Sequence, residues 1–214
     1  HRTDRAPETK CSNTRNRCIS ICLDIVRSPK AGIACALNHG LSYCSANFVA
    51  RMDADDICAP KRLSSQIEFM HANPTFTVVG TSAVLFSTEM NYCPDTTLPY
   101  TRLMENLEPC SVLRPSLSIS DPGFMAWTMH FSCTISHPTV VFQKDTILEL
   151  AGYDESISCS EDYDLWLRLL GRCSRSMISL PYIGLWHRKH NKSISSARAL
   201  TQKSEADEAC FQAM

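Results

Sequence analysis

The alternation of short apolar runs with a helical pattern near the start of the chain most constrains the fold. Residues 19–26 are rich in β-branched and apolar side chains and are typical of a buried strand. Residues 47–52 and 76–79 are two further runs of this kind. Between the first two runs, residues 32–46 carry apolar side chains at helical spacing, which predicts a helix.

A second helix is expected to begin near Pro60, because a proline in the first turn gives up an N–H that has no helical partner. Leu63, Ile67 and Met70 are its predicted buried stripe, and Asn73 marks its end. The order strand, helix, strand, helix, strand predicts an α/β fold, a mainly parallel sheet flanked by helices.

The second half of the chain is less regular. Residues 87–136 are interrupted by prolines and show no lasting period. After them the sequence predicts a strand at 139–142, a helix at 144–150, a helix at 161–170 and a strand around 182–186.

Composition excludes several classes of protein. The net charge is −1 over 214 residues, which argues against a nucleic-acid-binding surface. No run approaches the roughly 20 apolar residues of a membrane-spanning helix, and the first residues do not form a signal peptide. The 12 cysteines include no CxxC pair, which favours reduced, mostly buried thiols in a cytoplasmic setting over zinc or disulfides.

Three carboxylates, Asp53, Asp55 and Asp56, follow the predicted strand at 47–52. Ligands of open α/β sheets bind beyond the carboxyl ends of strands, and carboxylate oxygens suit Mg²⁺ or Mn²⁺. Acidic residues are also common in solvated turns, and the spacing alone favours that interpretation.

A second acidic group opens the helix at 161–170. Ser160 is the expected cap, and Glu161 and Asp162 lie in the first turn, where the helix dipole stabilises negative charge. A helix start without further function is therefore a strong alternative. Asp164 and Arg168 are four residues apart and are expected to pair.

A basic stretch, His187–His190, follows the last predicted strand. One of its side chains could contact a phosphate or a metal, and a solvated basic turn explains the composition equally well.

Taken in order, these segments resemble the family 2 glycosyltransferases with the GT-A fold, over about residues 19–196. The blocks that carry the resemblance are Gly32–Leu41, Ala50–Gln66 with a DxD motif, His137–Glu155, Glu161–Arg168 with an ED motif, and Arg188–Ser195. Several blocks in the family's order favour a ligand site over a turn at the Asp cluster.

The resemblance implies roles on the donor side of a site. Asp53 would contact the nucleotide ribose or the metal, and Asp55 would hold Mn²⁺ or Mg²⁺ on the donor diphosphate. Arg51 and Arg188 would bind the donor, and His190 would assist the metal.

On the acceptor side, the resemblance implies that Asp162 is the catalytic base, with Glu161 as the alternative. The implied reaction is an inverting, hexosyltransferase-type transfer from a nucleotide-sugar, expected to be UDP-linked, to a hydroxyl of a glycan or other acceptor. The expected location is cytoplasmic, compatible with peripheral association at a membrane face.

The family's first strand-helix-strand unit is not recognisable, and residues 19–26 look like its third strand. This predicts a chain truncated at its N-terminus, with weak nucleotide binding and low stability. Residues 1–17 are expected to be a leader, residues 18–196 the incomplete glycosyltransferase domain, and residues 197–214 a surface helix or tail.

Two alternatives stay open. One is a non-catalytic GT-A-like fragment that keeps the motifs. The other is a nucleotidyltransferase, which shares the α/β sheet and metal-binding carboxylates, but no Gly-rich phosphate loop is present near the start of the chain.

Overall fold

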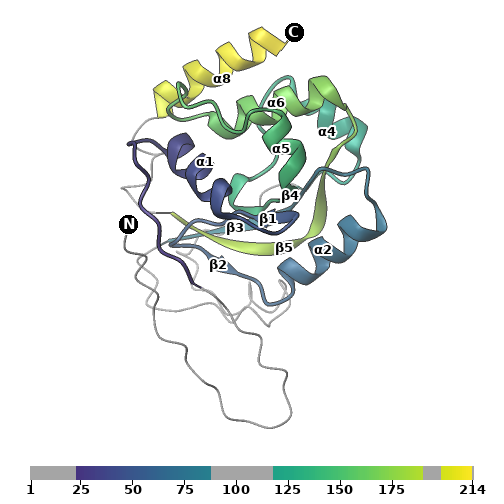
Figure 1. Ribbon diagram of the computed structural model, residues 1–214. Helices are drawn as coiled ribbons and strands as arrows, with labels where there is room; N and C mark the ends of the chain where they lie inside the picture. The colour runs from purple at the N-terminus through teal and green to yellow at the C-terminus, as the bar shows by residue number, and fades with distance from the viewer. Residues whose placement is uncertain (1–22, 88–117, 190–198, 214) are drawn as a thin grey trace.

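The computed structural model describes residues 23–87, 118–189 and 199–213 (Figure 1). Within these ranges a single mixed sheet has the strand order β1-β4-β3-β5-β2. The elements, in chain order, are α1 (Ile33–Tyr43), β1 (Phe48–Ala50), β2 (Ile57–Cys58), α2 (Arg62–Ala72), β3 (Val78–Ser87), α4 (Pro122–Met129), the 3-10 turn η1 (His137–Thr139), β4 (Val141–Gln143), α5 (Lys144–Glu149), α6 (Glu161–Arg172), β5 (Met177–Lys189) and α8 (Ala199–Ala213).

Helices cover both faces of this sheet, as Figure 1 shows. One face packs against α1, α4, α5 and α6, and α8 lies over α6. The largest core lies here, around Trp166 and Leu165 of α6, which are fully buried. On the other face, Met70 of α2 packs against Val79 of β3 and Ile178 of β5. The expected α/β class, with a sheet between helices, is confirmed.

The described sheet is mixed, so the expected parallel pairing is accompanied by antiparallel pairings. Only β3 and β5 run parallel, although theirs is the longest pairing, and the pairs β1–β4, β3–β4 and β2–β5 are antiparallel. Strands that follow each other in a sequence are usually neighbours in a sheet. Instead β4, which comes much later in the chain, lies between β1 and β3 and runs against both.

Residues 19–26 were expected to form a strand, but residues 23–26, the part of this range that the structure describes, do not. Residues 23–26 have no regular secondary structure, and Ile25 is 87% exposed. None of the described strands pairs with them. An apolar run becomes a strand only when a neighbour satisfies its backbone hydrogen bonds, and residues 19–22 lie outside the described ranges.

The buried face of α2 also differs from the expectation. Met70 is buried, but Leu63 is 44% exposed, while Arg62 and Gln66 are buried at 1% and 0%. The guanidinium of Arg62 donates to the carbonyl of Arg51 at 2.7 Å and to the side-chain oxygen of Gln66 at 3.1 Å. Polar side chains therefore hold α2 against the sheet, because they satisfy acceptors that an apolar stripe would leave unpaired.

The helix α4 lies in the region where no period was found. Pro122 occupies its first turn, and the carboxylate of Asp121 accepts a hydrogen bond from the N–H of Phe124 at 2.6 Å. An Asp-Pro pair of this kind is a helix start signal. It could have been recognised from the sequence. The helices that were expected, including one in the C-terminal tail, are present. None of the described helices is long and apolar enough to span a membrane.

The pairing of β3 with β5 depends on a close approach at Gly184. A Cβ at this position would lie 2.3 Å from Oγ1 and 2.8 Å from Cβ of Thr81. Gly184→Ala is therefore expected to lower the free energy of unfolding by about 1–3 kcal/mol through overpacking. At Gly171 in α6 a Cβ would meet nothing within 4 Å. Gly171→Ala is the control and should add about 0.5–1 kcal/mol. Urea denaturation measures both, and equal stabilities of the two variants would contradict the close approach.

Candidate functional site

A cavity of about 440 Å³ opens where the segment after β1, the loop before α6 and the end of β5 meet. Its lining residues are Ile33, Arg51, Asp53, Asp55, Cys133, Ile135, Ser136, His137, Pro138, Ser158, Cys159, Glu161, Asp162, His187, Arg188 and Gln202. The structure thus brings together Asp53, Asp55, Arg51, Arg188, Glu161 and Asp162, which are far apart in the sequence. His190 lies outside the described residues.

The first side of the cavity is built on the chain that leaves β1. The guanidinium of Arg51 contacts both oxygens of Asp53, at 2.8 Å and 2.7 Å. The N–H of Arg51 donates to the carbonyl of Val140, which holds this segment beside β4. Arg51 is largely buried whereas Asp53 is 38% exposed, so the pair orients the Asp53 carboxylate toward the cavity mouth.

Asp56 is the buried carboxylate of this cluster. It is only 8% exposed, and its Oδ1 accepts a hydrogen bond from the N–H of Arg188 at 2.9 Å. Its Oδ2 is buried with no hydrogen-bond partner among the described residues, and burial raises the pKa of this carboxyl. Ligand atoms of Asp53, Asp56 and His187 all lie within 4.8 Å of one another. Two carboxylates and an imidazole are a suitable ligand set for Mn²⁺ or a similar divalent cation.

This grouping differs in detail from the expectation of Asp53, Asp55 and His190. Asp56 was seen only as part of the cluster, and His187 only as one of several basic candidates. The turn after Asp53 directs the side chain of Asp56 inward, toward β5. Asp55 lines the cavity as well, and its carbonyl accepts a hydrogen bond from Nε of Arg188 at 2.8 Å.

Arg188 connects the end of β5 to this cluster. Its guanidinium lies 4.5 Å from the ring centroid of Phe86 on the neighbouring strand β3, a cation–π contact. With its hydrogen bond to the Asp55 carbonyl, this contact holds the positive charge of Arg188 at the cavity wall.

Glu161 and Asp162 line the cavity from the start of α6. Burial, together with the charge of Asp162, raises the pKa of Glu161 to about 7. Burial also raises the pKa of Asp162, although its Oδ1 accepts a hydrogen bond from the N–H of Tyr163. The side chain of Asp162 is 19% exposed and that of Glu161 is 6% exposed, so Asp162 is the more accessible carboxylate.

His137 is a site residue to which no role was assigned from the sequence. Its Nδ1 is 4.0 Å from a carboxylate oxygen of both Glu161 and Asp162, and its Nε2 is hydrogen-bonded to the hydroxyl of Tyr153 at 2.9 Å. Burial lowers the pKa of His137 well below its usual range, so the ring is neutral at physiological pH. It therefore makes a polar contact with the acidic pair and no ion pair.

The start of α6 is not capped as expected. Ser160 occupies the N-cap position, but its hydroxyl donates to the carbonyl of Gln202 at 3.0 Å and makes no cap hydrogen bond. The prediction of a Ser160 cap is therefore wrong, because α8 lies close enough for its Gln202 carbonyl to accept the hydrogen bond of the Ser160 hydroxyl. The predicted pairing of Asp164 with Arg168 is confirmed at 2.6 Å.

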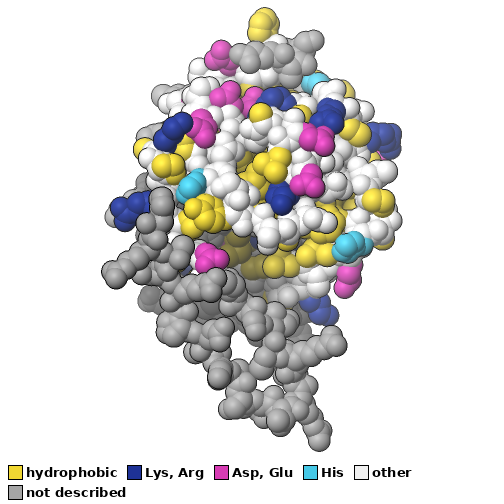
Figure 2. All heavy atoms as spheres, viewed as in Figure 1, with side chains coloured by type: hydrophobic (Ala, Val, Ile, Leu, Met, Phe, Trp, Pro, Cys, Tyr) yellow, Lys and Arg dark blue, Asp and Glu magenta, His cyan; other side chains and the backbone are white. Residues whose placement is uncertain are grey.

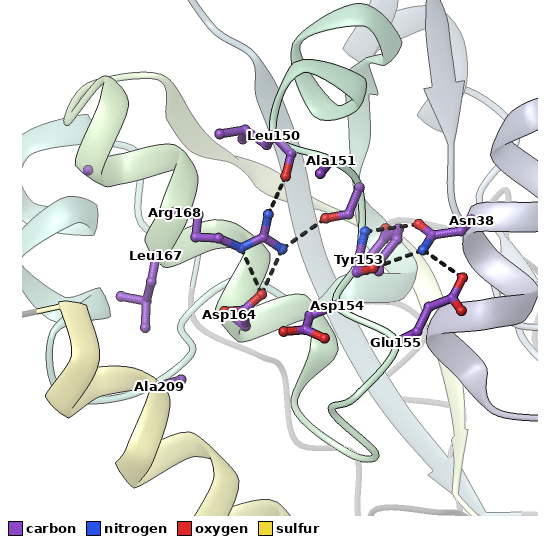
Figure 3. Close-up of a pocket in the computed structure, with 12 residues that line it drawn as sticks. Asn38, Leu150, Ala151, Tyr153, Asp154, Glu155, Asp164, Leu167, Arg168 and Ala209 are labelled. Carbon is purple, nitrogen blue, oxygen red and sulfur yellow. Dashed lines mark hydrogen bonds and ion pairs between the residues drawn. The ribbon is translucent and has the colours of Figure 1, made fainter.

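A second hollow, of about 820 Å³, lies between α1, α6 and α8 (Figure 3). Its charged groups are engaged with each other and with the backbone. Arg168 contacts Asp164 and donates to the carbonyls of Leu150 and Gly152 at 2.6 Å and 2.8 Å. Because these donors are used inside the protein, the Arg168 network stabilises the turn after α5.

The described surface shows no sign of a polyanion-binding face on the side seen in Figure 2. Lys and Arg side chains are interspersed there with Asp and Glu side chains. This agrees with a net charge of −1.

The raised pKa of Glu161 predicts a pH-dependent stability in metal-free buffer. A carboxyl whose pKa rises from 4.5 to about 7 on folding contributes stability that is present below 4.5 and lost as the pH rises through 7. The loss has an upper limit of about 3 kcal/mol. Glu161→Gln should remove much of this slope, whereas Glu68→Gln on the exposed face of α2 should keep it. Thermal melts at pH 5 and pH 8 measure the effect, and parallel slopes for wild type and Glu161→Gln would contradict the burial.

The chain is similar to known glycosyltransferases. The family model described as glycosyltransferase like family 2 matches residues 15–212. An uncharacterized glycosyltransferase of Haemophilus influenzae is 29% identical over 181 residues, which are 84% of this chain and 59% of that protein. The O-antigen biosynthesis glycosyltransferase WbnJ of Escherichia coli is 32% identical over 159 residues, 74% of this chain and 54% of that protein.

Among solved structures, the mannosyltransferase PcManGT from Pyrobaculum calidifontis, in complex with GDP-Man and Mn²⁺, superposes with a TM-score of 0.52. The identity is 16%, and the match covers 86% of this chain and 43% of that one. This likeness concerns the fold, and it confirms the expected GT-A architecture. This chain therefore belongs to the glycosyltransferase-like family 2.

Proposed function

We propose that this chain carries the site of a metal-dependent, inverting glycosyltransferase that moves a sugar from a nucleotide-sugar to a hydroxyl acceptor. The observation that carries the proposal is the meeting of two acidic groups in one cavity. Asp53 and His187 line this cavity, with the buried Asp56 within 4.8 Å of both, and Glu161 and Asp162 line it from the start of α6.

The residues of the first side fit a divalent cation. The buried Oδ2 of Asp56 has no hydrogen-bond partner among the described residues, and leaving such an acceptor unsatisfied is costly. Asp53, Asp56 and His187 would hold the ion, with Asp55 beside them. When bound, the ion neutralises charge on the diphosphate leaving group. We propose that the bound ion is Mn²⁺ or Mg²⁺.

Arg51 and Arg188 have complementary tasks on the donor side. Arg51 orients Asp53 through its two-point contact. Arg188 lines the cavity with its charge held by Phe86 and the Asp55 carbonyl, where it can approach a diphosphate. A uridine nucleotide is the donor that we expect first.

Asp162 is the proposed base, and Glu161 is the alternative. Asp162 is the more accessible of the two, and it would accept the proton of the acceptor hydroxyl as that oxygen attacks the anomeric carbon. The attack displaces the nucleoside diphosphate in one step with inversion. Glu161 remains mostly buried and has a pKa near neutrality, so it can share a proton with its neighbour.

The chain spans between one half and three fifths of the length of the two relatives described above. Activity, donor and acceptor are therefore proposals, and a non-catalytic fragment with the same motifs is the competing function. The seven described cysteines are free thiols, which supports a reducing compartment such as the cytoplasm, including the cytoplasmic face of a membrane.

Incubation of the chain with UDP-sugars, or with GDP-mannose as a second donor arm, tests the proposal. We expect release of UDP that depends on Mn²⁺ and stops with EDTA, and a transferred product whose anomeric configuration is inverted in NMR spectra. No nucleotide release from any donor would favour the non-catalytic fragment. Pyrophosphate release from a nucleoside triphosphate would instead indicate a nucleotidyltransferase.

A further inference from the structure

The C-terminal helix α8 reaches the candidate site from outside the sheet. Figure 1 shows α8 lying along α6, and Ala209 of α8 is buried in the same core as the apolar side chains of α6. Gln202, near the start of α8, lines the site cavity together with Ser158 and Cys159. The helix is thus part of the cavity wall on the side of Glu161 and Asp162.

Glu205 of α8 holds the loop that leads into α6. One carboxylate oxygen accepts hydrogen bonds from the hydroxyl of Ser158 at 2.6 Å and from its N–H at 3.2 Å. The other oxygen accepts the N–H of Cys159 at 2.7 Å. Partial burial raises the pKa of Glu205, but these hydrogen bonds outweigh it, so the net change is downward and the group is ionised at neutral pH.

These contacts hold the loop immediately before α6, whose N-cap residue has no side-chain cap hydrogen bond. Ser160 makes no cap hydrogen bond, and its hydroxyl donates to the Gln202 carbonyl instead. Three consecutive residues of the loop, Ser158 to Ser160, are therefore tied to α8 immediately before Glu161 and Asp162. The direction in which the two carboxylates leave the backbone depends on this loop, and Glu205 controls it through charge-assisted hydrogen bonds.

We propose that Glu205 is a positioning residue, which holds Glu161 and Asp162 at the acceptor side of the cavity through the backbone of Ser158 and Cys159. The proposal rests on the proposed function of this cavity. A purely structural tether between α8 and α6 is the competing explanation. It would change stability without changing the protonation or the geometry of the acidic pair.

Three variants of the 214-residue chain test the proposal: Glu205→Ala, Glu205→Gln and Asp207→Ala. Glu205→Ala removes both acceptors. Glu205→Gln keeps one amide oxygen that can accept a loop N–H. Asp207 is an exposed carboxylate of the same helix and serves as the matched control. Hydrogen exchange of the Ser158 and Cys159 amides, Mn²⁺ affinity, and kcat with its pH dependence are measured for each.

The expected result is a loss of amide protection at Ser158 and Cys159 in Glu205→Ala, with unchanged Mn²⁺ affinity. The kcat of this variant should fall about 10- to 100-fold, because small displacements of catalytic groups are costly. Glu205→Gln should recover part of the kcat. Since the charge of Glu205 also contributes to the raised pKa of Glu161, the acidic limb of the pH profile should move to lower pH in both variants.

The outcomes separate this inference from the proposed function. If wild type transfers sugar and Glu205→Ala keeps its kcat and pH profile, the positioning role is overturned. If wild type shows no transfer but Glu205→Ala loses the amide protection, the proposed function fails while the hold on the loop stands. If the Ser158 and Cys159 amides are as protected from hydrogen exchange in Glu205→Ala as in Asp207→Ala, the inference is overturned whatever the activity.

Discussion

Replacing Asp162 with asparagine is expected to lower kcat by a factor of about 10²–10⁴, the usual contribution of a positioned general base. Asparagine has nearly the same shape but cannot accept the proton of the acceptor hydroxyl. Mn²⁺ and nucleotide affinity should change much less than kcat, because Asp162 is not one of the three proposed metal ligands, Asp53, Asp56 and His187. Single-turnover kinetics with a saturating donor measure the effect.

The matched control is Asp145→Asn, an exposed carboxylate in the first turn of α5. It should keep wild-type kcat. Glu161→Gln separates the two candidates for the base. If Glu161→Gln loses more activity than Asp162→Asn, the roles are reversed. If both keep more than half of the wild-type kcat, the acidic pair is not the catalytic base.

The second large effect is on stability. Arg62→Met should lower the free energy of unfolding by about 2–5 kcal/mol, because two acceptors lose a donor at about 1–3 kcal/mol each. Those acceptors are the carbonyl of Arg51 and the amide oxygen of Gln66. The carbonyl of Val140 also accepts from Arg62, at 3.3 Å, but it keeps the hydrogen bond from the N–H of Arg51. Methionine can fill much of the volume but supplies no donor. Urea denaturation measures the loss, and the exposed Lys61→Met is the control.

This variant also tests the coupling of α2 to the site. The carbonyl of Arg51 is held by Arg62, and the side chain of Arg51 orients Asp53. We therefore expect Arg62→Met to weaken Mn²⁺ binding as well as folding. If Arg62→Met is as stable as Lys61→Met, the buried hydrogen bonds of Arg62 contribute little to the free energy of unfolding.

Several elements of the fold could be predicted because their signals are local. The helix α6 follows from its apolar spacing and from the Asp164–Arg168 pair, and α1 and α5 follow in the same way. The position of β4 between β1 and β3 could not be predicted, because pairing partners far apart in the sequence leave no local period. Residues 23–26 have the composition of a strand but form no regular secondary structure, because a strand also needs a pairing partner that the local sequence does not reveal.

The site shows a similar division. The Asp cluster and the Glu161–Asp162 pair were recognised as candidates from the sequence. The inward direction of Asp56, the approach of His187 and the contact of His137 with the acidic pair depend on how distant segments meet. Arg62 and Gln66 were not included in the predicted buried stripe, because the sequence does not reveal which backbone acceptors a polar side chain will meet.

Asp53, Asp56 and His187 are proposed to form a divalent cation site at the cavity that Glu161 and Asp162 also line. Titration of Mn²⁺ in the presence of UDP, followed by electron paramagnetic resonance, tests it most directly. We expect one bound ion per chain, with affinity reduced by about 10- to 100-fold in Asp56→Asn and unchanged in Asp145→Asn. Equal Mn²⁺ affinity of wild type and Asp56→Asn would contradict it.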